Sequence, residues 1–90
     1  MPNILLELDT ARELMALARQ DVELSETMRR AELRRFEQGA SDFFLVNIRE
    51  ETAADARVRY YGAIRRARVA QANFDAATVN LAGLGISGDF

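Results

Sequence analysis

Hydrophobic and polar residues follow the three-and-four spacing of a helix along two long stretches of this 90-residue chain. Between residues 3 and 38 there is no glycine or proline, and residues that favour helices dominate. The pattern resumes over about 42–82, where Gly62 costs about 1 kcal/mol relative to alanine without ending it. We therefore predict helices over about 3–38 and about 42–82. Three closely spaced glycines then predict that the second helix stops at Gly83, leaving a flexible tail over 83–90.

The segment between the two helices carries the signals of a tight turn. Gly39 stands where a glycine can adopt a left-handed backbone and end a helix. Ser41 is expected to cap the second helix by accepting a backbone hydrogen bond, and Asp42 adds a negative charge at its positive end. With the turn at 39–41, the chain is predicted to be one all-α domain over 1–90, a long antiparallel two-helix coiled-coil hairpin.

Apolar positions form stripes along both predicted helices. The first helix has two stripes, one at Leu14, Leu17, Leu24, Met28 and Ala31 and the other at Ala11, Met15, Ala18, Val22 and Ser25. The second has one main stripe, at Val46, Arg49, Ala53, Ala56, Tyr60, Ala63, Ala67, Ala70, Phe74, Ala77 and Leu81. Such a repeat, sustained for about five heptads, is typical of a coiled coil. Because a helix with two apolar stripes needs two neighbours, we also expect self-association.

The leucine-containing stripe is predicted to face the alanines of the second helix. Partners across a turn have residue numbers with a nearly constant sum, here 80 or 81, which sets Met28, Leu24, Asp21, Leu17 and Leu14 against Ala53, Ala56, Tyr60, Ala63 and Ala67. Large residues would then meet small ones, and the Tyr60 hydroxyl would donate a hydrogen bond to Asp21. Replacing one of these leucines by alanine should cost about 2–4 kcal/mol if its site is buried.

Composition narrows the possible chemistry. All twelve basic residues are arginine, and the chain has no histidine, lysine or cysteine. It therefore has no side chain that titrates near neutral pH and no thiolate nucleophile. We expect no catalytic residues, no metal and no cofactor. The net charge of −2 argues against a nucleic-acid partner. The N-terminus lacks the pattern of an export signal, and the apolar runs, such as that over 43–46, are far too short to span a membrane.

Four groups of residues could carry a function or merely structure. The adjacent Glu50 and Glu51 point about 100° apart on a helix, which favours solvated surface over a carboxylate pair. The basic group comprises Arg57, Arg59, Arg65, Arg66 and Arg68, and its spread around the helix favours ion pairing over phosphate binding. The phenylalanines at the turn, Phe36, Phe43 and Phe44, fit a contact site or a plug equally well. The glycine-rich end lacks the lysine of a phosphate loop.

The turn also carries a family resemblance. The pattern Arg35-Phe36-x-x-Gly39-Ala40-Ser41-Asp42-x-x-x-Val46-x-x-x-Glu50, followed by an alanine-rich helix, resembles the TolC family of outer-membrane efflux proteins. The resemblance covers about residues 8–85. It implies a trimeric channel whose coiled-coil hairpins build a tunnel in the periplasm, with each hairpin tip contacting a periplasmic adaptor protein. The implied partner-binding residues are Phe36, Gly39, Ala40, Ser41 and Asp42.

The sequence departs from the family pattern in two respects. Family members usually hold two such hairpins, β-strands and an export signal, so this chain looks like the C-terminal hairpin of a longer protein. Some members ring the tunnel with aspartates at positions occupied here by Leu45 and Ile48, so no acidic gate is expected. Two other interpretations stay open, namely a free-standing coiled coil that dimerises into a four-helix bundle, and a helical binder of nucleic acid or of an acidic partner.

Overall fold

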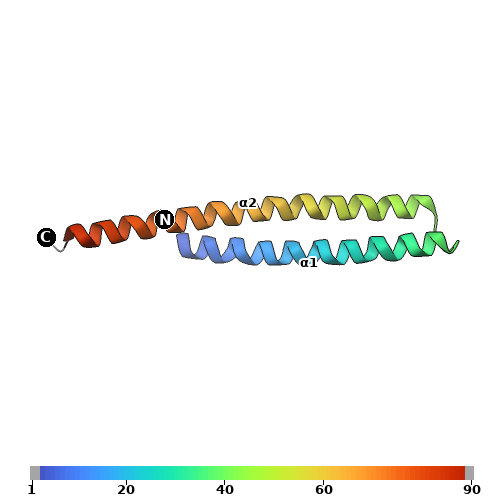
Figure 1. The fold of residues 1–90 in the computed structure, drawn as a ribbon, viewed down its shortest axis with the longest axis horizontal. Coiled ribbons are helices and arrows are strands. Elements are labelled where there is room, and N and C mark those ends of the chain that lie inside the picture. Colours follow the sequence, from blue (N-terminus) through green and yellow to red (C-terminus); the bar gives the residue numbers. More distant parts are fainter. Residues whose placement is uncertain (1–2, 89–90) are drawn as a thin grey trace.

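The structure, a computed structural model, describes residues 3–88, with side chains as far as residue 83. Two helices, α1 (Ile4–Glu37) and α2 (Phe43–Gly88), lie antiparallel and form a rod with extents of 77 × 15 × 15 Å (Figure 1). The described residues contain no strand. The predicted all-α two-helix hairpin is confirmed.

Both helices begin at a side-chain cap. Asn3 caps α1, because its Oδ1 accepts a hydrogen bond from the Leu6 amide at 2.9 Å. Asp42 caps α2 in the same way, accepting from the Leu45 amide at 2.8 Å. The prediction that Ser41 is this cap is therefore wrong by one residue. The Asp42 carboxylate supplies both the hydrogen bond and the negative charge that favour a helix N-terminus.

The turn between the helices closes α1 by backbone hydrogen bonds. Gly39 has a φ of 76°, and its amide donates to the Phe36 carbonyl at 3.0 Å. The Ala40 amide donates to the Arg35 carbonyl at 2.8 Å. This pair of bonds is the Schellman motif, in which glycine is favoured because a Cβ is strained at positive φ. The predicted role of Gly39 at the end of α1 is confirmed.

The second helix is longer than predicted. It continues through Gly83 to Gly88, so the predicted end at Gly83 is wrong, and only residues 89–90 of the predicted tail lie outside the described residues. A glycine ends a helix when it adopts a left-handed backbone, and Gly39 is the only described residue with positive φ. The last turns of α2 extend past the start of α1 (Figure 1), which leaves Val79 and Leu81 exposed.

The two helices meet along one narrow seam. On α1 the seam consists of Leu8, Ala11, Met15, Ala18, Val22, Ser25, Arg29 and Glu32, all buried or half-buried. On α2 it consists of Val46, Arg49, Ala53, Ala56, Tyr60, Ala63, Ala67, Ala70, Phe74 and Ala77. The predicted stripe of α2 is thus confirmed, except for the exposed Leu81. Towards the chain ends the seam is apolar, and towards the turn it takes in charged side chains.

The predicted contact face of α1 is wrong. Leu17 and Leu24 are each 60% exposed, whereas the neighbouring stripe that contains Ala11, Ala18 and Ser25 faces α2. Small residues recur every seven positions in that stripe, and the facing seam of α2 is mostly alanine. Two small-residue faces let the helix backbones approach closely, and this packing leaves the leucines outside.

The predicted register survives the change of face. The ion pairs Glu32 with Arg49 and Asp21 with Arg59 have residue numbers that add to 81 and 80. Asp21 accepts its hydrogen bond from Arg59, at 2.9 Å, and the predicted bond from Tyr60 is absent from the described residues. The pairs Glu26 with Arg57 and Arg29 with Glu50 add to 83 and 79, so the sums of the interhelical ion pairs lie on both sides of the predicted 80 or 81.

A disulfide between the two helices tests this register and face. Oxidation of Ser25→Cys with Ala56→Cys should join the helices within one chain, because both positions are buried in the seam and their numbers add to 81. Non-reducing electrophoresis and mass spectrometry of the protein measure the product. The matched control Leu24→Cys with Ala56→Cys should oxidise much more slowly, because Leu24 points away from the seam. Faster oxidation of the control would show that the leucine stripe faces α2 after all.

Candidate partner-binding site

The turn leaves an accessible surface of backbone and small side chains at one end of the rod. Ala40 is exposed, and a Cβ built on Gly39 would meet no atom within 4 Å. The Arg35 guanidinium stabilises the turn by donating a hydrogen bond to the Ala40 carbonyl at 3.2 Å. A partner helix could therefore approach the turn backbone closely without displacing a bulky side chain.

Aromatic side chains flank this surface. Phe36 and Phe43 lie across the turn from each other, with ring centroids 6.5 Å apart and a tilted arrangement. Phe36 is 40% exposed, Phe43 65% and Phe44 70%. The pair of rings braces the turn in part, but most of the aromatic area faces outward. The sequence left a plug and a contact site equally open, and this exposure favours a contact site.

A buried carboxylate lies beneath the turn. Glu32 is only 5% exposed, and its Oε1 accepts from the Arg49 guanidinium of α2 at 3.4 Å. The pKa of Glu32 is lowered, chiefly by the nearby Ser41 hydroxyl and also by Arg49 and Arg35, although burial opposes the shift. Neither Ser41 Oγ nor Glu32 Oε2 has a hydrogen-bond partner of standard geometry. The lowered pKa favours the carboxylate form of Glu32, which joins α1 to α2 beneath the turn through Arg49.

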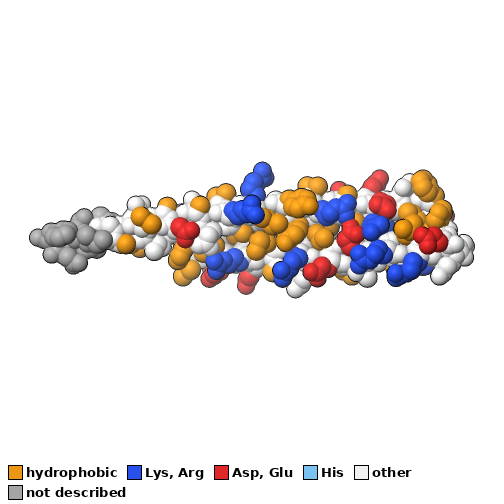
Figure 2. All heavy atoms as spheres, in the orientation of Figure 1, with side chains coloured by type: hydrophobic (Ala, Val, Ile, Leu, Met, Phe, Trp, Pro, Cys, Tyr) orange, Lys and Arg blue, Asp and Glu red, His pale blue; other side chains and the backbone are white. Residues whose placement is uncertain are grey.

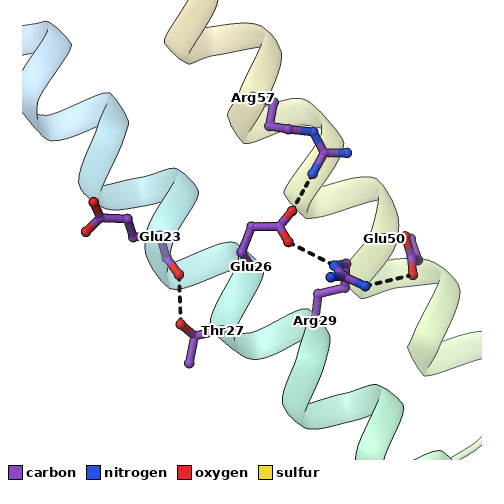
Figure 3. Close-up of polar contacts among 6 residues, drawn as sticks. All are labelled: Glu23, Glu26, Thr27, Arg29, Glu50 and Arg57. Atoms are coloured by element: carbon purple, nitrogen blue, oxygen red, sulfur yellow. Dashed lines mark hydrogen bonds and ion pairs between the residues drawn. The ribbon is translucent and has the colours of Figure 1, made fainter.

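A network of four charged residues continues this connection along the rod (Figure 3). Glu26 of α1 accepts from Arg57 of α2 and, at 3.1 Å, from Arg29 on its own helix. Arg29 also reaches Glu50 of α2 at 3.6 Å. The pKa of Arg29 is raised, first of all by its hydrogen bond to Glu26. Because these side chains stay partly solvated, we expect the network to add little to the free energy of folding.

The five predicted partner-binding residues divide into two groups. Phe36, Gly39 and Ala40 present exposed surface at the tip. Ser41 is half-buried beside Glu32, and the Asp42 carboxylate is engaged in capping α2, although that residue is exposed. The structure thus brings all five together around the turn, with three free to contact a partner and two that shape the turn.

Glu32 belongs to the site but was not predicted from the sequence. A glutamate in a helix is ordinarily expected on the surface. The spacing of the small residues at positions 11, 18 and 25 was the one signal that position 32 faces the second helix. Continued by one heptad, that pattern points to position 32. The predicted stripe of the second helix also contains Arg49, which pairs with the Glu32 carboxylate.

The basic group is used in part for ion pairs between the helices. Arg57 and Arg59 pair with Glu26 and Asp21, as the ion-pairing interpretation expected, though across the hairpin and not along one helix. Among residues 3–83, no Asp or Glu side chain lies within 4 Å of the guanidinium groups of Arg65, Arg66 or Arg68. Glu50, of the adjacent acidic pair, belongs to the network described above.

Over the described residues, His, Cys, Asp and Glu side chains nowhere gather in a group of three that could hold a metal ion. Neither α1 nor α2, as far as they are described, has a stretch apolar and long enough to cross a membrane. No protein-family model matches the sequence, and neither a curated protein nor a solved structure matches it.

Proposed function

We propose that this hairpin is a periplasmic part of a TolC-like outer-membrane efflux or secretion channel. In this proposal it forms a segment of the tunnel wall, and its tip contacts the adaptor protein of a tripartite export system. The channel is a homotrimer of the longer protein to which the hairpin belongs. The resemblance of the motif from Arg35 to Glu50 supports this proposal.

The observation that carries the proposal is the chemistry of the tip. The rod ends in Gly39, which has open space around it, and the exposed Ala40, flanked by Phe36 and Phe43, which are 40% and 65% exposed. A surface of small residues and backbone suits the tip of another helical hairpin, because helices can approach closely only where side chains are small. Exposed aromatic rings add apolar contact area around it.

The sides of the rod suit a wall built from many helices. Hydrophobic side chains reach the surface along the shaft between charged ones, as one face shows in Figure 2. A two-helix rod cannot cover such side chains by itself, whereas neighbouring hairpins in a channel can. The exposed apolar residues would then pack against those neighbours, and the ion-paired flank would face water.

Ala40→Arg in the full-length channel should weaken contact with the adaptor. The substitution places a long charged side chain on the exposed tip, and it avoids the backbone strain that any replacement of Gly39 would add at its φ of 76°. We expect weaker cross-linking to the adaptor and greater sensitivity to an exported toxic compound, with the amount of trimer unchanged.

The matched control is Gln20→Arg, which adds the same charge at an exposed position in the shaft of α1. Cells that depend on the control channel should remain as resistant as those with the unmodified channel. If Ala40→Arg leaves both cross-linking and resistance unchanged, the tip does not bind the adaptor.

A further inference from the structure

One side of the hairpin carries a second apolar stripe that the seam does not use. We call this surface the leucine face, defined by Leu14, Leu17, Asp21, Leu24 and Met28 of α1 with Arg59, Gly62, Arg66 and Val69 of α2. The residues from the two helices share one side, because Leu14 and Arg66 line the same grooves and Asp21 bonds Arg59. On α1 the stripe lies about a quarter turn from the seam, where a helix in a four-helix bundle meets its second neighbour.

The hairpin exposes more surface than a compact chain of the same mass. A compact globular chain of this mass, 10.1 kDa, exposes about 5,300 Å². The hairpin exposes 6871 Å², an excess of about 1,600 Å² over that compact value. A stable protein interface buries about 800 Å² on each partner. One further copy on the leucine face would therefore remove about half of the excess.

The opposite flank is a poorer surface for docking. It carries the network around Glu26 and the bond that Arg12 donates to Gln71 at 2.6 Å. Covering these groups would remove water from charges that are only partly paired, which costs free energy. The leucine face has one interhelical ion pair, Asp21 with Arg59, and one further charged residue, Arg66, at its edge, and its other members are mainly apolar.

The leucine face is complementary to itself in one particular orientation. If two hairpins lie face to face with their tips at the same end, a two-fold axis along the rod sets α1 of each against α2 of the other. By the observed register, Leu17 then falls opposite the partner's Gly62, where an added Cβ would meet nothing within 4 Å in the single hairpin. Asp21 falls opposite the partner's Arg59 at the same level, so a pair within one chain becomes a ring of four alternating charges.

We propose that a second copy of this chain docks on the leucine face to form a parallel four-helix bundle, with Leu17 of each copy seated in the groove beside Gly62 of the other. The groove around Gly62, about 500 Å³ and lined also by Ala18, Ala63 and Arg66, receives the leucine. The inference concerns the 90-residue chain itself and does not depend on a role in transport. A failure of dimerisation would leave the proposed tip contact untouched, and the reverse also holds.

Gly62→Leu tests the groove without weakening the fold. Leucine is a better helix former than glycine, and the single hairpin has space for it, so helicity and thermal stability of the monomer should be kept or raised. The added side chain fills the groove, and the dimer dissociation constant measured by sedimentation equilibrium should rise at least about tenfold. An unchanged or lower dissociation constant would overturn the proposal, because extra apolar surface alone can only strengthen association.

Leu17→Glu with the matched control Leu5→Glu locates the interface. Both leucines are more than half exposed, at 60% and 54%, but Leu5 lies on the flank that carries Arg12. Leu17→Glu should be monomeric at micromolar concentration, and Leu5→Glu should dimerise as the unmodified chain does. Equal behaviour of the two variants would place the interface elsewhere.

The distance between spin labels on the two copies measures their relative orientation. Because the chain has no native cysteine, a label can be attached at one introduced cysteine alone. With Gln38→Cys labelled at the exposed tip, parallel copies should place the labels within about 25 Å of each other, because packed helix axes lie 8–10 Å apart. An antiparallel pair centred on the same leucines would separate them by about 50 Å at 1.5 Å per residue. A distance near the longer value would refute the proposed orientation.

Discussion

Leu8→Ala should lower the free energy of unfolding of the hairpin by about 2–4 kcal/mol, the usual cost of removing a buried leucine side chain. Leu8 is 2% exposed and belongs to the only apolar cluster of the described seam, together with Ala11, Ala67 and Ala70. Met15 and Phe74 pack against that cluster. The other buried members of the cluster are alanines, which cannot extend into the space that the substitution leaves.

The contrast with Leu24→Ala makes this result informative. Leu24 is 60% exposed, so its removal should cost much less than the removal of Leu8. Urea unfolding followed by circular dichroism gives both values, measured in a Leu17→Glu background so that association does not add to the apparent stability. A loss at Leu24 as large as that at Leu8 would restore the original expectation that the leucine stripe forms the seam.

The sequence was sufficient to predict two helices, their turn and their register. The long absence of glycine and proline gives the helices, and Gly39 marks the turn because few other residues tolerate its backbone. The steps of three and four on α2 identify its seam, since that helix offers only one continuous stripe. Where one interpretation dominates locally, sequence reasoning and structure agree.

The choice of face on α1 could not be made from the same pattern. Both stripes of that helix have helical spacing, and hydrophobicity alone favours the one with the leucines. The structure uses the stripe of Ala11, Ala18 and Ser25 because the facing residues are themselves small. Close approach of two helices depends on both surfaces at once, and a property of a pair cannot be found in one helix pattern taken alone.

The site was predictable to a similar degree. Phe36, Gly39 and Ala40 stand out from the sequence because glycine, small residues and aromatics meet at one turn. The roles of Ser41 and Asp42 differ by one residue from those predicted, which is a typical error at a helix end. Glu32 was missed, since burial of a carboxylate depends on Arg49, a residue from the other helix.

Ala56→Leu should separate the helices, and it tests the close approach directly. Ala56 is 0% exposed in the middle of the seam, opposite the small-residue stripe of α1. Alanine and leucine have similar helix propensities, so the helix itself should tolerate the change. The added methyl groups must push the backbones apart, at a cost of about 1–3 kcal/mol for overpacking. The displacement should also lengthen the ion pairs that flank the position, including the bond from Arg57 to Glu26.

The matched control for that substitution is Ala72→Leu, the same chemical change at an exposed position of α2. It should leave the free energy of unfolding within about 0.5 kcal/mol of the unmodified hairpin, as surface substitutions usually do. Thermal unfolding of both variants, again in the Leu17→Glu background, provides the comparison. If Ala56→Leu were as stable as Ala72→Leu, the seam would have room for a large side chain. Close packing of small residues would then not be what holds the two helices together.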